Sequence, residues 1–124
     1  MNKRNFGGLE TPISEVGLGC WQFGGDFGPM TDECAHQIMA AAVADGVDFF
    51  DTADVYGAGK SENLIGEFLR RHPGNEVKVV TKFGRDGDVF PDKYSEDALR
   101  SGIQSSCQRL GVEALDCVQL HCVP

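Results

Sequence analysis

The chain has 124 residues, with 11 lysines and arginines against 19 acidic residues, which gives a net charge of −8. This balance argues against nucleic acid as a main partner, because binding a phosphate backbone requires clustered basic side chains. No apolar run approaches the roughly 20 residues of a membrane span, and no apolar signal core follows the charged N-terminus. We therefore expect one cytoplasmic domain without a nucleic-acid or membrane partner.

The five cysteines are an odd number and contain no C-x-x-C pair. This pattern argues against a disulfide scaffold or a zinc site, and we expect no bound metal. We expect the thiols to be small buried apolar groups in a reducing compartment, with a metal or redox role for Cys122 beside His121 as the alternative. The five are Cys20, Cys34, Cys107, Cys117 and Cys122.

The first half of the chain predicts a hairpin, two strands and the helix between them. Glycines and a proline between short apolar patches indicate a small hairpin over residues 5–16. A short strand over residues 16–19 is followed by a loop that is rich in glycine and aromatic residues. Thr31 then caps a helix that stops at Gly46, and a second apolar strand spans residues 47–51.

The second half repeats this order of helix and strand. A stripe of apolar residues predicts a helix over residues 61–71, and a third strand follows over residues 77–82. After a polar loop, a third helix is predicted over residues 95–111 and a fourth strand over residues 116–121. Strands that alternate with helices indicate βαβ crossovers and hence a parallel sheet.

This order of elements favours an α/β fold, the TIM (β/α)8 barrel, of which the chain covers the N-terminal hairpin and about four βα units. Eight such units typically need about 250 residues. We therefore expect residues 1–124 to form a barrel domain that is incomplete at its C-terminus. Its open sheet edges favour self-association. Halves that pair to complete a larger structure, or a sheet that is not a barrel, are the alternatives.

Ionisable residues stand where three of these strands end. Asp51, Lys82 and His121 each follow an apolar run, and Tyr56 comes five positions after Asp51. In a parallel barrel these strand ends share one face, which is where active sites lie. Taken singly, each residue also has a structural interpretation, such as a strand-end cap for Asp51 or a turn aromatic for Tyr56.

Together, these residue types indicate acid–base chemistry on a carbonyl group. A tyrosine is a weak proton donor at neutral pH, and a nearby ammonium group stabilises its phenolate form. Lys82 is placed to supply that charge, Asp51 to pair with the lysine, and His121 to donate a hydrogen bond to a substrate oxygen. Such a set protonates a carbonyl oxygen while hydride reaches its carbon, which implies a nicotinamide cofactor.

Four linked motifs resemble those of the aldo/keto reductases. Residues 51–57, Asp-Thr-Ala-Asp-Val-Tyr-Gly, with Ser-Glu at 61–62, resemble the family's signature. Residues 81–84 and 119–121 resemble its next two motifs, and residues 17–25 resemble its first barrel loop. The resemblance runs through the whole chain in order.

The resemblance implies reduction of aldehydes or ketones with NADPH, or the reverse oxidation with NADP+. It implies that Tyr56 is the proton donor, that Lys82 eases the release of its proton, and that Asp51 pairs with Lys82. His121 would orient the substrate carbonyl. The implied cofactor contacts are Gly19, Cys20, Trp21 and Asp51, and the implied substrate contacts are Trp21, Tyr56 and His121.

Two other functions remain open from the sequence. One is a regulatory or binding subunit on the same scaffold, similar to the potassium-channel β subunits. The other is a truncated fragment without activity, because most family contacts to the cofactor come from later strands. Residues 122–124 also depart from the family pattern. Which carbonyl compound would be the substrate is not readable from these motifs.

Overall fold

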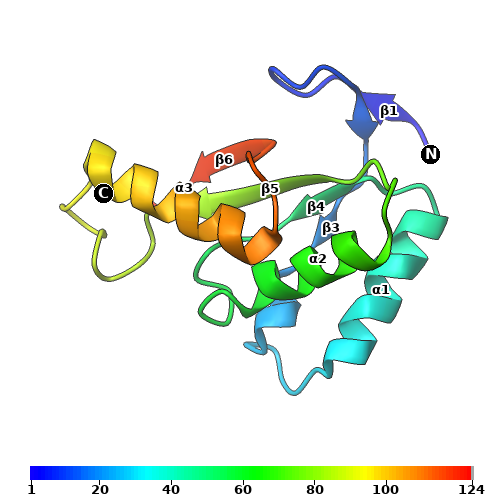
Figure 1. Cartoon of the computed structure of the whole chain (residues 1–124), viewed down its shortest axis with the longest axis horizontal. Coiled ribbons are helices and arrows are strands. Elements are labelled where there is room, and N and C mark those ends of the chain that lie inside the picture. Colours follow the sequence, from blue (N-terminus) through cyan, green and yellow to red (C-terminus); the bar gives the residue numbers. More distant parts are fainter. Residues whose placement is uncertain (124) are drawn as a thin grey trace.

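The computed structural model describes residues 1–123, which form a parallel sheet with helices on one face (Figure 1). A separate two-stranded hairpin precedes the sheet. In chain order the described elements are β1 (Lys3–Arg4), β2 (Ile13–Ser14), β3 (Leu18–Gly19), the 3-10 helix η1 (Trp21–Gly24), α1 (Asp32–Ala44), β4 (Phe49–Asp51), α2 (Lys60–Arg71), β5 (Lys78–Phe83), α3 (Glu96–Leu110) and β6 (Cys117–Leu120).

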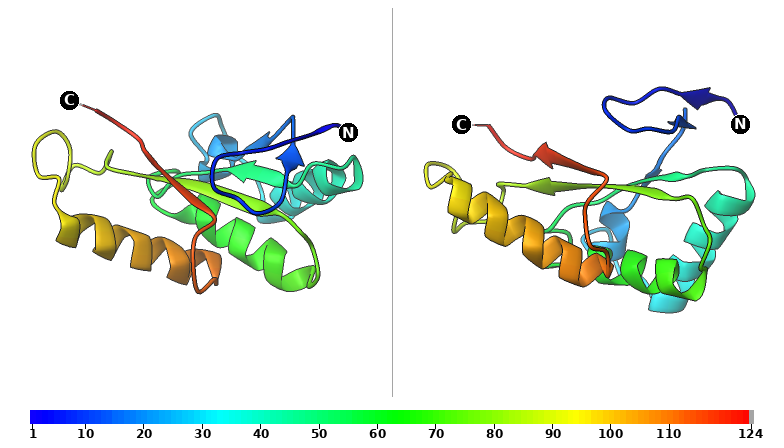
Figure 2. Two further views of the ribbon diagram at one scale, coloured as in Figure 1. Left: turned by 90° about the horizontal axis from the view of Figure 1, so that it is seen from above. Right: turned by 45° about the horizontal axis from the view of Figure 1, so that its top comes forward.

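The sheet has the order β3-β4-β5-β6, in which every neighbouring pair is parallel. One α-helix connects each strand to the next, and α1, α2 and α3 all lie on the same side of the sheet (Figure 2). Four successive strands with the three α-helices between them have the arrangement found in a (β/α)8 barrel, in which the helices form the outer layer. It confirms the predicted fold class and the predicted order of elements.

The core lies between the sheet and its helices. Phe50 of β4 packs there with Met39, Ile65, Phe68 and Leu110 from the three helices, and each of these side chains is at most 1% exposed. Successive strand residues face opposite sides of a sheet. The neighbours of Phe50 in β4 therefore face away from the helices. One of them is Asp51, the predicted site residue at the end of the strand.

The hairpin differs from its prediction because its first strand lies earlier in the chain. Lys3 and Arg4 form β1 and pair with β2 in antiparallel register. Ion pairs rather than an apolar pattern hold this segment, since Arg4 pairs with Glu15 at 3.1 Å and Lys3 pairs with Asp48. Asp48 directly precedes β4, so the hairpin lies at the amino ends of the strands.

Two further expectations need correction. The prediction that all five cysteines are buried was wrong, because only Cys20 is buried and Cys34 is exposed. The second helix begins at Lys60, one residue before its predicted start, and follows a left-handed Gly59. Thr31 and Ser95 cap α1 and α3 as predicted, each by accepting a backbone hydrogen bond in the first turn.

The apolar stripe of α3 is buried only towards its C-terminal end. Leu110 is 1% exposed, whereas Leu99 near the other end is 37% exposed. Between α3 and β6 lies an apolar groove of about 680 Å3, whose lining includes Leu99, Ile103, Val118 and Leu120. Within residues 1–123, no helix combines the length and hydropathy that crossing a membrane requires.

The contact between α2 and α3 predicts a stability effect at Gly66. A Cβ atom added there would lie 2.4 Å from the carbonyl oxygen of Arg109 and 2.8 Å from that of Leu110, so the helices would have to separate. Alanine is favoured over glycine inside a helix by up to about 1 kcal/mol. Overpacking costs about 1–3 kcal/mol and outweighs this gain. We therefore expect Gly66→Ala to lower the free energy of unfolding measured in urea.

The matched control is Gly87→Ala, because a Cβ atom at Gly87 meets nothing within 4 Å. Its effect should stay within about 0.5 kcal/mol. Equal unfolding free energies for the two variants would contradict the close contact between α2 and α3.

Candidate active site

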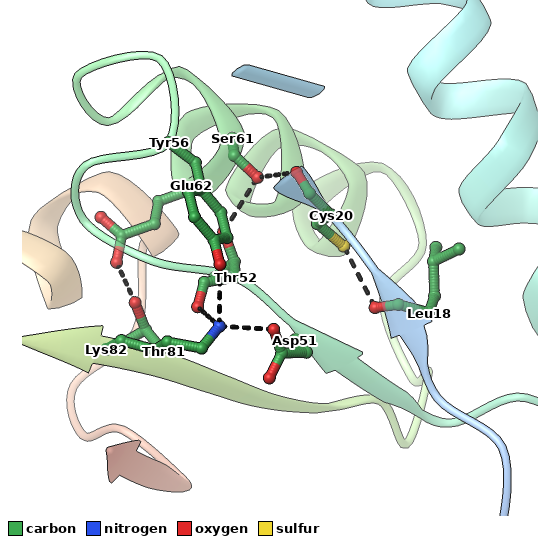
Figure 3. A network of polar contacts seen from close by, with 9 residues as sticks. All are labelled: Leu18, Cys20, Asp51, Thr52, Tyr56, Ser61, Glu62, Thr81 and Lys82. Atoms are coloured by element: carbon green, nitrogen blue, oxygen red, sulfur yellow. Dashed lines mark hydrogen bonds and ion pairs between the residues drawn. The ribbon is translucent and has the colours of Figure 1, made fainter. Parts of the chain in front are cut away.

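The ammonium group of Lys82 links three groups at the carboxyl ends of neighbouring strands (Figure 3). Its Nζ donates hydrogen bonds to Asp51 Oδ1 at 2.5 Å, to the Thr52 carbonyl oxygen at 2.9 Å and to the Tyr56 hydroxyl oxygen at 3.2 Å. An ammonium group has three protons, and this geometry uses all of them. The Lys82 side chain is 13% exposed, so the adjacent carboxylate balances a charge that water reaches poorly.

Parallel pairing brings these residues together. The register places Asp51 beside Val80, two residues before Lys82 on the same face of β5. The ladder continues past β4, since the Thr52 amide donates to the Val80 carbonyl at 2.8 Å. The His121 amide likewise donates to the Phe83 carbonyl at 2.8 Å, which fixes the chain just after β6.

Tyr56 is buried between two other rings at this edge of the sheet. Its ring is stacked on Trp21 at a centroid distance of 5.7 Å and meets His121 edge to face at 5.8 Å. The Lys82 nitrogen lies 5.0 Å from the centroid of the Tyr56 ring, within the range of a cation–π interaction. The structure thus brings all four predicted catalytic residues together. Their catalytic roles stay predictions.

The environment of His121 favours its neutral form. Burial, followed by the positive charges of Lys82 and Arg85, lowers the pKa of the imidazole, and the Asp51 carboxylate opposes this only in part. The ring atom Nδ1 is buried and has no hydrogen-bond partner within residues 1–123. A neutral imidazole carries one N–H group, which can donate to an oxygen.

The residues predicted to contact a cofactor fall into two groups. Gly19 and Trp21 are exposed and the Asp51 side chain is 37% exposed, so all three border the open side of the site. Cys20 is fully buried, and its thiol donates to the Leu18 carbonyl. Burial first, and then the Asp51 charge, raises the pKa of the Cys20 thiol.

The backbone of Cys20 is also engaged within the chain. Its amide donates to the Asp51 carbonyl at 2.8 Å, and its carbonyl accepts from the Ser61 hydroxyl at 2.8 Å. Cys20 therefore connects β3 to its neighbours, while the predicted cofactor contact stays a prediction.

A second layer of polar residues, which the sequence analysis did not assign, lies behind the site. Glu62 is completely buried and accepts hydrogen bonds from Thr81 and Arg109, each at 2.5 Å. The sequence carried a signal for this burial, because Glu62 stands three residues before Ile65 on the apolar side of α2. A carboxylate at such a position requires partners, and Arg109 is too distant in sequence to be recognised as one.

The fold and the site together define the class of this protein. It is an α/β protein whose four parallel strands and three α-helices form part of a (β/α)8 barrel, and acid–base side chains lie at the carboxyl ends of its strands. The sequence model of the aldo/keto reductase family matches residues 15–124. The chain belongs to the aldo/keto reductase family.

Two relatives that match this chain are longer than it is. A probable aldo-keto reductase from soybean, Glycine max, is 35% identical over 113 residues, which cover 88% of this chain and 33% of that protein. The structure of a glycerol dehydrogenase from Gluconobacter oxydans superposes with a TM-score of 0.81 at 32% identity, covering 95% of this chain and 38% of its own. The chain thus spans between a third and two-fifths of the length of these two relatives.

A protein of lower sequence identity has a similar structure. An aldo-keto reductase from Klebsiella pneumoniae, solved in complex with NADPH, has a TM-score of 0.76 at 23% identity. The match covers 93% of this chain and 37% of that one. At this level of identity the match shows a shared fold.

The electrostatics of the site predict how His121 titrates. The chain has three histidines, so ring signals in NMR spectra can be followed separately and assigned with His121→Gln. We expect the His121 ring to titrate below its ordinary pKa of 6.5. Because the unfolded ring then binds its proton at a higher pH than the folded ring, this residue lowers stability as the pH falls below 6.5.

Lys82→Met should move the His121 titration midpoint to higher pH, because it removes a nearby positive charge. Lys60→Met is the matched control, since Lys60 pairs with Asp32 and is not among the charges that act on His121. A midpoint at or above 6.5 in the unaltered chain would contradict this account of the site.

Proposed function

We propose that this protein reduces aldehydes or ketones to alcohols by hydride transfer from NADPH, with Tyr56 as the proton donor. The observation that carries the proposal is the Lys82 ammonium, which bonds both the Tyr56 hydroxyl oxygen and the Asp51 carboxylate. Membership of the aldo/keto reductase family supports the same reaction class.

The contacts of Lys82 suit proton donation by Tyr56. Because the ammonium donates to the tyrosine oxygen, the phenolic proton is directed elsewhere and is available to a substrate. When that proton leaves, negative charge develops on an oxygen 3.2 Å from Nζ, and the ammonium stabilises it. Asp51 keeps the ammonium in place and balances its charge before the proton moves.

His121 and Trp21 suit the binding of a carbonyl compound. A neutral His121 can donate its N–H to the carbonyl oxygen, and it meets the Tyr56 ring edge to face. Trp21 is held by a hydrogen bond from its indole nitrogen to Asp26 at 2.6 Å and by an edge contact with Phe27. This aromatic wall favours apolar or aromatic groups beside the carbonyl.

The open side of the site fits a nicotinamide cofactor. Asp51 uses one carboxylate oxygen for Lys82 and is 37% exposed, so its second oxygen is available to a hydroxyl group of a ligand. A Cβ atom at Gly19 would meet nothing within 4 Å, which leaves space at the end of β3 next to Trp21. The cofactor supplies the hydride, and these residues would hold and orient it.

The Tyr56 hydroxyl provides the direct test. We expect Tyr56→Phe to lower the rate of NADPH oxidation with a panel of aldehydes by about 10²–10⁴-fold, because general acid catalysis is lost. NADPH binding, followed by the fluorescence of Trp21, should be retained. Tyr94→Phe is the matched control, since the Tyr94 hydroxyl lies 2.9 Å from the backbone carbonyl oxygens of Gly84 and Cys122 and bonds no side chain within residues 1–123.

Full activity of the Tyr56→Phe variant would show that Tyr56 is not the proton donor. Binding of NADPH without turnover of any carbonyl compound by the unaltered protein would favour a binding subunit over an enzyme.

We also propose that two copies of the chain associate through the groove between α3 and β6. Leu99 and Leu120 on its two sides are 37% and 54% exposed, and the groove between them is apolar. Two chains of charge −8 repel one another, so an apolar contact is the kind that would bring them together.

We expect sedimentation velocity to show dimers whose fraction rises with protein concentration. Leu120→Ser should shift the population to monomer because it places a hydroxyl in the apolar contact. Val16→Ser is the matched control, since Val16 is 56% exposed and lies at the other end of the sheet. Monomers at all concentrations in the unaltered chain would contradict the proposal.

A further inference from the structure

Two threonines stand directly beside the residues of the proposed active site and face the other way. Thr52 follows Asp51, and Thr81 precedes Lys82. Adjacent residues of an extended chain point to opposite sides, so the threonines face α2 while their neighbours face the open side. Both threonines are at most 1% exposed, and both hydroxyl groups bond residues in the first turn of α2 (Figure 3).

Ser61 contacts the first of these threonines. Its hydroxyl donates to the Cys20 carbonyl at 2.8 Å and lies 2.8 Å from the Thr52 hydroxyl. Since Ser61 has one proton and gives it to Cys20, Thr52 must be the donor in the second bond. Ser61 therefore joins Cys20, at the end of β3, to Thr52, which follows β4. Thr52 is also the residue whose carbonyl oxygen accepts a hydrogen bond from Lys82.

Glu62 contacts the second threonine. Its Oε1 accepts from the Thr81 hydroxyl and its Oε2 from Nε of Arg109, both at 2.5 Å. Glu62 is 0% exposed and the Arg109 side chain is 26% exposed, and Glu62 ties α2 to β5 through Thr81 and to α3 through Arg109. An isolated buried carboxylate is strongly unfavourable, and a buried pair is tolerated only when its geometry is well satisfied. Movement of Thr81 away from α2 would break that geometry.

Consecutive residues of one helix thus contact the backs of both strands that carry the Lys82–Asp51 pair. A rotation of either strand end would move a catalytic side chain, and it would also break a buried hydrogen bond on the opposite face. Displacements of about 1 Å at a reacting group can cost about 10²-fold in rate, so this constraint bears on catalysis as well as on stability.

We propose that Ser61 and Glu62 are positioning residues, which act through Thr52 and Thr81 to fix the Lys82 ammonium against its three acceptors. Their relevance to catalysis rests on the proposed function. The positioning itself concerns the free protein and can be measured without cofactor or substrate.

The test observes the Lys82 ammonium directly by NMR in the ¹⁵N-labelled 124-residue chain. Because all three of its protons are donated to oxygen atoms, we expect a signal that persists where exposed ammonium protons exchange too fast to be seen. The signal is assigned to Lys82 if it is missing from the spectrum of the Lys82→Arg variant. We expect Thr81→Val and Ser61→Ala, which remove one hydroxyl each, to abolish the signal through faster exchange.

Two controls separate positioning from general stability. Thr81→Ser keeps the hydroxyl and should keep the signal. Ile65→Val destabilises α2 through a side chain that is 0% exposed but has no polar contact with the strand ends, and it should also keep the signal. The melting temperature of each variant confirms that it is folded at the temperature of measurement.

The proposal is overturned if Thr81→Val and Ser61→Ala leave the signal unchanged, or if Ile65→Val removes it equally. It is also overturned if the unaltered chain shows no protected ammonium, because the three bonds would then not persist in solution. A protected signal with the expected pattern, in a protein that never oxidises NADPH, would uphold the positioning and contradict the proposed function instead.

Discussion

The arrangement of the site depends on one partly desolvated cation, the Lys82 ammonium. An ammonium in a poorly hydrated place needs an opposite charge and acceptors for its three protons. Asp51 supplies the negative charge, and the Thr52 carbonyl and the Tyr56 hydroxyl supply the other two acceptor oxygen atoms. All three residues lie at the end of β4 or shortly after it. Strands β4 and β5 must therefore lie in parallel and in this register. Parallel neighbouring strands cannot be joined by a tight turn, and here the crossover through α2 makes the connection.

The sheet separates two kinds of environment. On the helix side, the core consists of aromatic and aliphatic side chains such as Phe50 and Phe68, and a buried polar cluster that includes Glu62 lies beside them. On the other side, charged and aromatic groups meet at the carboxyl ends of the strands. Burial, followed by the positive charges of Lys82 and Arg85, lowers the pKa of His121, and the Lys82 charge would also stabilise negative charge on the neighbouring Tyr56 oxygen in the proposed reaction.

The sequence predicted the elements well where the pattern is local. Helix caps such as Thr31 and Ser95, and the apolar strands before Asp51 and Lys82, depend on neighbouring residues and were correctly located. The hairpin was misplaced because β1 is held by ion pairs, and a pair such as Lys3 with Asp48 joins residues that are distant in the sequence. Its composition gives no strand pattern to recognise.

The sequence by itself determined the family, the order of strands and helices, and the ionisable residues that follow three apolar strands together with Tyr56, because spacing along the chain encodes all of these. The tertiary structure decided which atoms meet. Glu62 finds Arg109, which is 47 residues away, and Cys20 turns inward instead of towards the open side. Such pairings depend on how helices pack against the sheet, and packing is a property of the folded chain that no local pattern records.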